Sequence, residues 1–246
     1  MATPSSSLKP AYRHQINTTP IHLGGPHAGS IDMQITPRVI LEVAHHEAII
    51  RQAYKDSVGV WTWSAGITSA SGHKVERYID NPQTMQKCLE VYIWLLREKY
   101  APAVDRAFAG HKLTEAQFAA ALSFHWNTGA IGRASWVKHF KAGDTAKAKK
   151  AFMNWSKPKE IIGRRRAERD LFFSGKWSGD GKIGEYTRVT KNHSPVWSSR
   201  INVDVRHAIE AILGSGNPPV RPDAPVTPQE ASRGLFAALI AAWFRR

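Results

Sequence analysis

Cysteine is almost absent from this chain of 246 residues, and a long apolar run is missing altogether. Cys88 is its single cysteine, so no disulfide can form within the chain, which excludes a small scaffold held together by disulfides. No run of about 18 apolar residues occurs, so the sequence predicts no transmembrane helix. Residues 1–20 contain no apolar core flanked by basic residues, so we expect no signal peptide.

Acidic residues are scarce relative to basic ones. The chain has 34 Lys and Arg against 20 Asp and Glu, which gives a net charge of +14. Such a balance favours polyanionic partners: nucleic acid, the anionic polymers of a bacterial envelope, or anionic lipid. Because no recognised nucleic-acid-binding motif is present, we expect no specific nucleic-acid partner and interpret the charge as non-specific attraction to an anionic envelope.

Composition divides the chain into five predicted segments. In order they are an irregular N-terminal arm (1–36), a main domain (37–173), a basic extension (174–213), a proline-rich linker (214–228) and an apolar terminal helix (229–246). The main domain is mostly helical in pattern, but its stretch 54–80 interleaves glycine with β-branched and aromatic residues. We therefore expect a mainly helical α+β domain with a small β-hairpin lobe.

Capping residues place the predicted helices. Thr36 followed by Pro37 predicts a helix start, and the apolar pattern extends that helix to about Arg51. A capping box at 114–117 predicts another helix, and Asp144 predicts the start of a third. Two further predicted starts are Asn81, for a helix to about Lys99, and Asn202, for a short helix that Gly214 ends. The stretch 174–200 is rich in Gly, Ser and Lys and is predicted to be mostly loop.

Glu47 is the residue that first points to chemistry. In the predicted first helix it projects from an apolar face, which is made by Val39, Ile40, Val43 and Ile50. A carboxylate on such a face costs free energy unless it is paired or protonated. Desolvation raises its pKa and favours the neutral acid, which glycoside hydrolysis needs as a proton donor. The alternative is a Glu47 that forms a salt bridge with an arginine beneath a loop.

The spacing of three polar residues resembles that of an enzyme family. Glu47, Asp56 and Thr62 form the pattern E-x8-D-x5-T, which resembles the active-site segment of phage-type lysozymes, glycoside hydrolase family 24. Later motifs resemble the same family in the same order. They are the helix 113–124 followed by Asn127-x-Gly129, the turn Ala142-Gly143-Asp144, and the pattern Arg164-Arg165-x-x-Glu168-x-x-Leu171. The resemblance covers about residues 37–173.

This resemblance implies a two-lobed lysozyme-like catalytic domain. It also implies a muramidase, which hydrolyses the β-1,4 bond between N-acetylmuramic acid and N-acetylglucosamine in peptidoglycan. By position, Glu47 would protonate the leaving oxygen, and Asp56 would stay ionised to stabilise the oxocarbenium-like transition state. Thr62 would hold the attacking water, and no cofactor is implied. Inversion and retention both stay open, because the sequence does not give the distance between the carboxylates.

The chain departs from the family pattern near these residues. Ser64 stands where the family has a glycine, Ile67 where it has a histidine, and Ala48 where a glycine follows the acid. These changes bear on the geometry of the hairpin and leave the three matched positions intact. Two other functions stay open: a non-catalytic envelope-binding protein on a lysozyme fold, and a related glycosidase such as a chitosanase or lytic transglycosylase.

Three other groups of residues each have two interpretations. His45 and His46 suggest a metal site, but Ile50 stands where H-E-x-x-H needs its second histidine, so we expect no metal. The arginines at 164–166 either bind phosphate or form a solvated helical face. Some tryptophans either stack on sugar rings or fill the core, and these are Trp61, Trp63, Trp126 and Trp136.

Peptidoglycan is the partner that the resemblance implies. The apolar helix at 229–246 is too short to span a bilayer and ends in two arginines, so it either docks on the main domain or contacts an anionic membrane or lipopolysaccharide. We expect a phage or prophage endolysin that is made in the host cytoplasm and reaches the cell wall after holin-type release. A virion-borne lysozyme is the variant that stays open.

Overall fold

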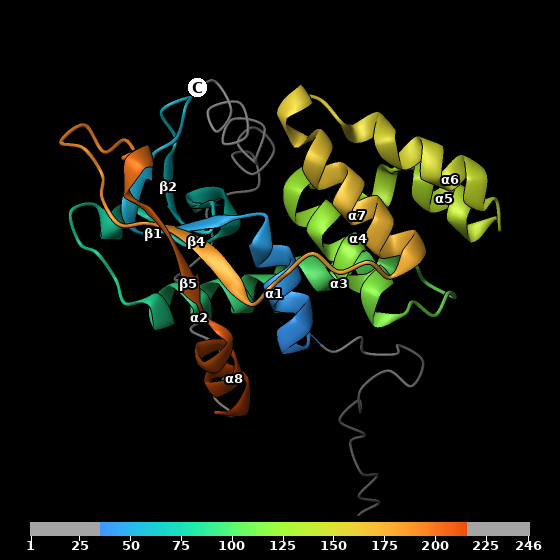
Figure 1. Ribbon diagram of the computed structural model, residues 1–246, viewed down its shortest axis with the longest axis horizontal. Coiled ribbons are helices and arrows are strands. Elements are labelled where there is room, and N and C mark those ends of the chain that lie inside the picture. Colours follow the sequence, from blue (N-terminus) through green and yellow to red (C-terminus); the bar gives the residue numbers. More distant parts are fainter. Residues whose placement is uncertain (1–34, 216–246) are drawn as a thin grey trace, which may run out of the picture. The chain divides into compact units, whose positions relative to one another are not determined.

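The computed structural model describes residues 35–215 (Figure 1). The predicted terminal helix (229–246), nearly all of the linker (214–228) and nearly all of the N-terminal arm (1–36) lie outside the described residues. The helices are α1 (Pro37–His45), α2 (Met85–Leu95), α3 (Ala101–Ala107), α4 (Glu115–Thr128), α5 (Ser135–Lys141), α6 (Thr145–Phe152), α7 (Ile162–Ser174) and α8 (Arg206–Gly214). The strands are β1 (Ala48–Lys55), β2 (Trp61–Ser64), β3 (Ile67–Thr68), β4 (Lys182–Tyr186) and β5 (Arg200–Asp204).

The strands form one mixed sheet in the order β3-β2-β1-β4-β5, which lies to one side of α4–α7 in Figure 1. β1, β2 and β3 are antiparallel neighbours, so the small β-hairpin lobe and the mainly helical α+β fold are confirmed. β4 lies parallel to β1, with Gly184 opposite Ala48, and β5 runs antiparallel to β4. The stretch 174–200, predicted to be mostly loop, therefore contributes an inner strand. Its signal was weak because β4 is short and its partner β1 lies far away along the chain.

α1 is shorter than predicted. The hydroxyl of Thr36 accepts a hydrogen bond from the Val39 amide, which confirms the predicted start. The helix ends at His45 rather than near Arg51. Glu47 therefore lies in the connection between α1 and β1, and not in the middle of a helical face.

A β-bulge in β1 explains the error. The strand shifts its register against β2 between Ile50 and Tyr54. As a result its buried residues come as two adjacent pairs, 49–50 and 53–54, instead of alternating with exposed ones. Buried pairs that recur four residues apart match the period of a helix face, so the apolar pattern alone continues the helix.

α2 begins at Met85 after the cap Thr84, and not at Asn81 as predicted. The helical path continues through a π-helical turn, Leu96–Tyr100, into α3 and so runs past the predicted end. Pro102 in the first turn of α3 has no amide hydrogen, which accounts for an irregular turn just before it.

α4 lies at the centre of the core, and its residues 118–124 are all buried. It packs against α1, α3 and α7. The predicted capping box is confirmed, because Thr114 and Gln117 each accept a hydrogen bond from the backbone amide of the other. Asp144 accepts a hydrogen bond from the Lys147 amide and caps α6, as expected.

α8 starts at Arg206, so the helix start predicted at Asn202 was wrong. Asn202 lies in β5 opposite Gly184 of β4, and Asp204 instead accepts a hydrogen bond from the Arg206 amide. α8 packs against α1 and α2, which joins this part of the basic extension to the main domain.

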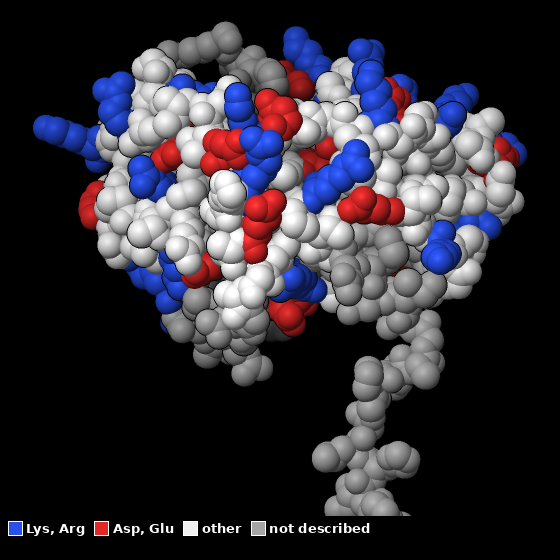
Figure 2. All heavy atoms as spheres, turned by 60° about the horizontal axis from the view of Figure 1, so that its bottom comes forward, with Lys and Arg blue, Asp and Glu red and all other residues white. Residues whose placement is uncertain are grey.

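Basic side chains are spread over the face shown in Figure 2, with acidic side chains among them. The described residues of that face thus form no single continuous basic stripe. Of the helices within residues 35–215, none combines the length and the apolar character that crossing a bilayer requires.

Candidate active site

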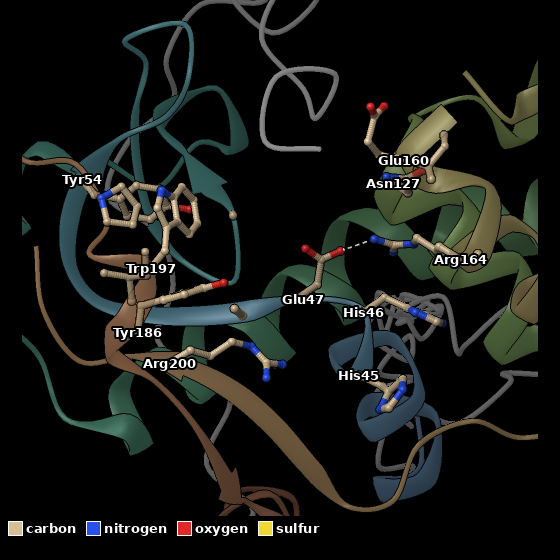
Figure 3. Close-up of a pocket in the computed structure, with 16 residues that line it drawn as sticks. His45, His46, Glu47, Tyr54, Asn127, Glu160, Arg164, Tyr186, Trp197 and Arg200 are labelled. Carbon is tan, nitrogen blue, oxygen red and sulfur yellow. Dashed lines mark hydrogen bonds and ion pairs between the residues drawn. The ribbon is translucent and has the colours of Figure 1, made fainter. Parts of the chain in front are cut away.

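A cavity of about 290 Å³ opens between the sheet and α7 (Figure 3). Glu47, from the connection between α1 and β1, lies between two groups of side chains. On the helical side are Asn127 of α4, Glu160 just before α7, and Arg164 of α7. On the side of the sheet lie mainly aromatic and cationic side chains, which are Tyr54, Tyr186, Trp197 and Arg200.

Burial and an ion pair together act on the protonation of Glu47. Its side chain is 15% exposed, and its Oε1 accepts a hydrogen bond of 2.6 Å from the guanidinium of Arg164. Burial raises the pKa of Glu47, and the opposing effect of Arg164 does not cancel that rise. The two interpretations of Glu47 are therefore compatible: the carboxyl is biased toward the neutral acid, and it is paired with an arginine.

A buried ion cluster on α7 holds Arg164 in place. Oε1 of Glu168 accepts hydrogen bonds from Arg164 at 2.8 Å and from the Ser123 hydroxyl at 2.6 Å. Oε2 of Glu168 pairs with Arg165, whose side chain is fully buried. Burial opposes ionisation of Glu168, but Arg165 and Arg164 outweigh it and lower its pKa. The cluster fixes Arg164, and through it Glu47, at the wall of the cavity.

Asp56 lies in the turn that follows β1. Its Oδ1 accepts hydrogen bonds from the amides of Val58 (2.9 Å) and Val60 (2.8 Å), so the carboxylate shapes the turn. Asp56 does not line the cavity. Tyr54 interacts electrostatically with both Asp56 and Glu47. Burial raises the pKa of the Tyr54 phenol, and the charges of Glu47 and Asp56 raise it further. Both carboxylates therefore lie within electrostatic range of Tyr54.

Thr62 is completely buried in β2, where it lies opposite Tyr54 of β1. Its hydroxyl donates a hydrogen bond of 3.1 Å to the carbonyl oxygen of Val60. Like Asp56, it does not line the cavity. The structure thus brings Asp56 and Thr62 together in the β1–β2 hairpin beside Tyr54, and places Glu47 alone of the three at the cavity wall. Their catalytic roles stay predictions.

The residues that depart from the resembled pattern are well accommodated. Ser64 has a φ of +53°, a left-handed conformation that glycine adopts freely, and its hydroxyl donates a hydrogen bond of 3.2 Å to the carbonyl oxygen of Cys88. Ile67 is buried in β3, so an apolar side chain fills the position of the family's histidine. Ala48 opens β1 and lines the cavity next to Glu47.

The tryptophans named from the sequence belong mainly to the core. Trp63, Trp126 and Trp136 are buried, so the sugar-stacking interpretation was wrong for them. Trp61 is half-buried and lies edge-on to the ring of His193. Trp197, which the sequence did not single out, is 40% exposed and lines the cavity.

His45 and His46 both line the cavity but differ in environment. His45 is exposed, whereas burial and then the charge of Arg164 lower the pKa of His46 to about 3. The imidazole of His46 is therefore neutral near pH 7. Within residues 35–215, no three His, Cys, Asp or Glu side chains are grouped in a way that would hold a metal ion.

Sequence reasoning missed the ion cluster and the wall formed by the sheet. Arg164 and Arg165 were expected to bind phosphate or face solvent, and that expectation was wrong because both are paired with buried carboxylates. The spacing of Arg164 and Glu168, four residues apart on one helix, was the available signal. No signal pointed to Trp197 or Arg200, since long-range strand pairing brings them to the cavity.

Comparisons with known proteins bear on this site. Residues 44–169 match the family described as phage lysozyme. No curated protein matches the chain. Among solved structures, an endolysin from Escherichia coli O157:H7 phage FAHEc1 is 21% identical, with a TM-score of 0.51 over 59% of this chain and 96% of that one.

Two further solved structures are similar at lower TM-scores. The muramidase domain of SpmX from Asticaccaulis excentricus is 23% identical, with a TM-score of 0.48 over 57% of this chain and 98% of that one. A P22 lysozyme mutant is 26% identical, with a TM-score of 0.46 over 57% of this chain and 99% of that one. The family match spans Glu47, Asp56, Thr62 and the ion cluster of α7, and it covers more than half of the sequence. The chain belongs to the phage lysozyme family.

Proposed function

We propose that this protein is a muramidase that hydrolyses the β-1,4 bond between N-acetylmuramic acid and N-acetylglucosamine in peptidoglycan. The observation that carries the proposal is the environment of Glu47: a largely buried carboxyl with a raised pKa at the wall of a cavity. A glycosidase needs such a group, because the leaving oxygen must receive a proton as the glycosidic bond breaks.

Arg164 supports this role in two ways. Because its guanidinium holds Oε1 of Glu47, Oε2 is left to carry the proton toward the glycosidic oxygen. When the proton has been transferred, Glu47 becomes a carboxylate next to a cation that is already in place. The lysozyme-family membership and the retained Glu47, Asp56 and Thr62 support the same reaction.

The proposal assigns Asp56 the ionised role, in which its charge stabilises the oxocarbenium-like transition state and helps to place the water. Thr62 is proposed to hold that water. Since the Thr62 hydroxyl is buried and already donates to the Val60 carbonyl, we expect Thr62→Ala to lower the rate less than a change at either carboxylate.

We also propose the biological role of a phage or prophage endolysin that reaches the wall after holin-type release. The net charge of +14 supports electrostatic attraction to the anionic envelope. Lysis of cells is therefore expected to fall steeply with salt, while cleavage of soluble fragments changes little. Equal salt sensitivity of the two reactions would remove this part of the proposal.

Digestion of purified peptidoglycan with product analysis tests the activity. The wild-type chain should release products with reducing ends, and Glu47→Gln should lower the rate about 10²–10⁴-fold while peptidoglycan binding is kept. Asp56→Asn is the companion variant, because the amide oxygen of Asn can still accept the two backbone hydrogen bonds while the charge is lost. Anhydro-muramic ends would instead identify a lytic transglycosylase, and no cleavage with binding retained would identify a non-catalytic envelope protein.

A further inference from the structure

Part of the cavity wall lies outside the part of the chain that matches the phage lysozyme family. The match ends at residue 169, yet four lining residues come from later in the chain, namely Tyr186, Pro195, Trp197 and Arg200. They belong to β4, to the start of β5 and to the segment between these strands. This part of the chain therefore adds a surface to the cavity that the family match does not include.

Strand pairing fixes this surface relative to Glu47. β4 pairs with β1 at Ala48, the residue directly after the acid, and β5 pairs with β4 so that Tyr186 lies opposite Arg200. The added surface and Glu47 are thus attached to the same sheet. Glu47 and these side chains therefore line one cavity (Figure 3).

Trp197 is the exposed aromatic residue of this surface. Tyr186, which is buried, holds it edge-on, with ring centroids 5.2 Å apart and planes at 88°. The indole keeps 40% of its surface exposed and lines the cavity. A large apolar ring with one polar group, held in place at a cavity wall, suits contact with the mixed polar and apolar face of a sugar.

Arg200 is the exposed cation of this surface. Among residues 35–215 it forms no ion pair with a carboxylate, whereas Arg51, Arg164, Arg165, Arg169 and Arg206 each do. Its guanidinium donates a hydrogen bond of 3.1 Å to Asn202 Oδ1 and lies against the backbone of Gly184, where an added Cβ would be only 2.8 Å away. The group is thus positioned by the sheet but keeps its charge available. A planar guanidinium in that state suits a carboxylate ligand.

We propose that Trp197 and Arg200 form a subsite for carboxylate-bearing glycan, in which the indole stacks on a sugar ring and the guanidinium pairs with a carboxylate of the muramic acid substituent. This inference rests on the proposed muramidase function and names the substrate feature that the cavity recognises. The carboxylate has two sources in peptidoglycan: the lactyl group of a glycan without peptides, or the peptide attached to it.

Binding to three soluble tetrasaccharides tests the subsite and its source of charge. The ligands are a peptide-bearing peptidoglycan fragment, the same fragment with its peptides removed, and a neutral N-acetylglucosamine tetramer. Measurements use the full chain with Glu47→Gln, so that no ligand is cleaved. Arg200→Gln should raise Kd about tenfold for one or both carboxylate-bearing ligands and leave the neutral tetramer unchanged. The ligand that loses affinity identifies the source of the carboxylate.

Trp197→Ala should instead raise the Kd of all three ligands, by about tenfold. Matched controls are Arg188→Gln, an exposed arginine of the same extension outside the cavity lining, and Ile201→Ala, an exposed apolar residue of β5. Both controls should bind like the parent.

Two results would overturn the subsite. One is unchanged binding of every ligand by Arg200→Gln and Trp197→Ala. The other is an equal loss for charged and neutral ligands in Arg200→Gln. Cleavage of peptidoglycan by the wild-type chain is measured in parallel. If cleavage depends on Glu47 and either of these results is found, only the subsite proposal is contradicted. No cleavage at all sinks the muramidase proposal.

Discussion

Arg164 and Arg200 line the same cavity but lie in different electrostatic environments. Arg164 is 9% exposed and donates to two carboxylates, Glu47 and Glu168, so its charge is used within the protein. Arg200 is exposed and, among residues 35–215, has no carboxylate partner. Burial with paired charge positions the candidate acid, whereas exposure leaves a charge for a ligand. Arginine therefore positions the candidate acid on one side of the cavity and, as we propose, binds a ligand on the other.

Breaking the buried cluster should have the largest effect on stability. Glu168→Gln leaves the fully buried guanidinium of Arg165 without its carboxylate, and we expect a loss of about 3–5 kcal/mol in the free energy of unfolding. Glu160→Gln is the control, because Glu160 lines the same cavity without an ion pair to another described residue. Its expected change is within about 0.5 kcal/mol. Urea denaturation measures the free energy of unfolding of both variants. Equal losses would show that the ion cluster contributes no more to stability than Glu160 does.

Removing the cation next to Glu47 should change the pH dependence of cleavage. Arg164 opposes the rise in the pKa of Glu47, so Arg164→Gln should raise that pKa further. A proton donor then stays protonated to higher pH, and the high-pH fall in kcat/KM should move upward in pH. Arg166→Gln, an exposed arginine on the same helix, is the charge-matched control. A shift to lower pH in Arg164→Gln, or the same shift in both variants, contradicts the electrostatic role.

An effect confined to acidic pH is expected from the neighbouring histidines. Burial lowers the pKa of His46 to about 3. Between pH 6.5 and about 3, His46 is therefore protonated in the unfolded chain but neutral in the folded chain. Stability from this group is complete above pH 6.5 and is lost as the pH falls toward 3, by about 1.4 kcal/mol per pH unit. His46→Gln should remove that slope, and the exposed His45→Gln should keep it. Unfolding followed between pH 4 and 7 decides, and parallel slopes in all three proteins would argue against burial as the cause.

Local chemistry made much of the helical part predictable. The caps at Thr36, Thr114 and Asp144 need only a side chain and an amide within three residues, so sequence sufficed for them. The end of α1 could not be read, because the bulge in β1 gives a strand the burial period of a helix. Glu47 was identified for its burial, although its position in the chain differs from the expected helical face.

What the sequence could not give depends on contacts between distant parts of the chain. Arg164 meets Glu47 only because α7 packs along α4 beside the start of β1. β4 joins the sheet through β1, which turned a predicted loop into one wall of the cavity. The burial of Thr62 and the role of Asp56 in its turn likewise depend on hairpin geometry. Residue type and spacing indicated which residues carry the chemistry, whereas the side chains that surround them could be identified only from the fold.

The central claim is that Glu47 is an acid whose surroundings raise its pKa, and NMR titration of its side-chain carboxyl carbon tests this most directly. The chain is labelled with ¹³C-glutamate, and Glu47→Gln assigns the signal. We predict a pKa above 4.5, the ordinary value for this group, and coincidence of that pKa with the high-pH fall in peptidoglycan cleavage. A pKa at or below 4.5, with Glu47 ionised wherever the enzyme is active, would contradict the account.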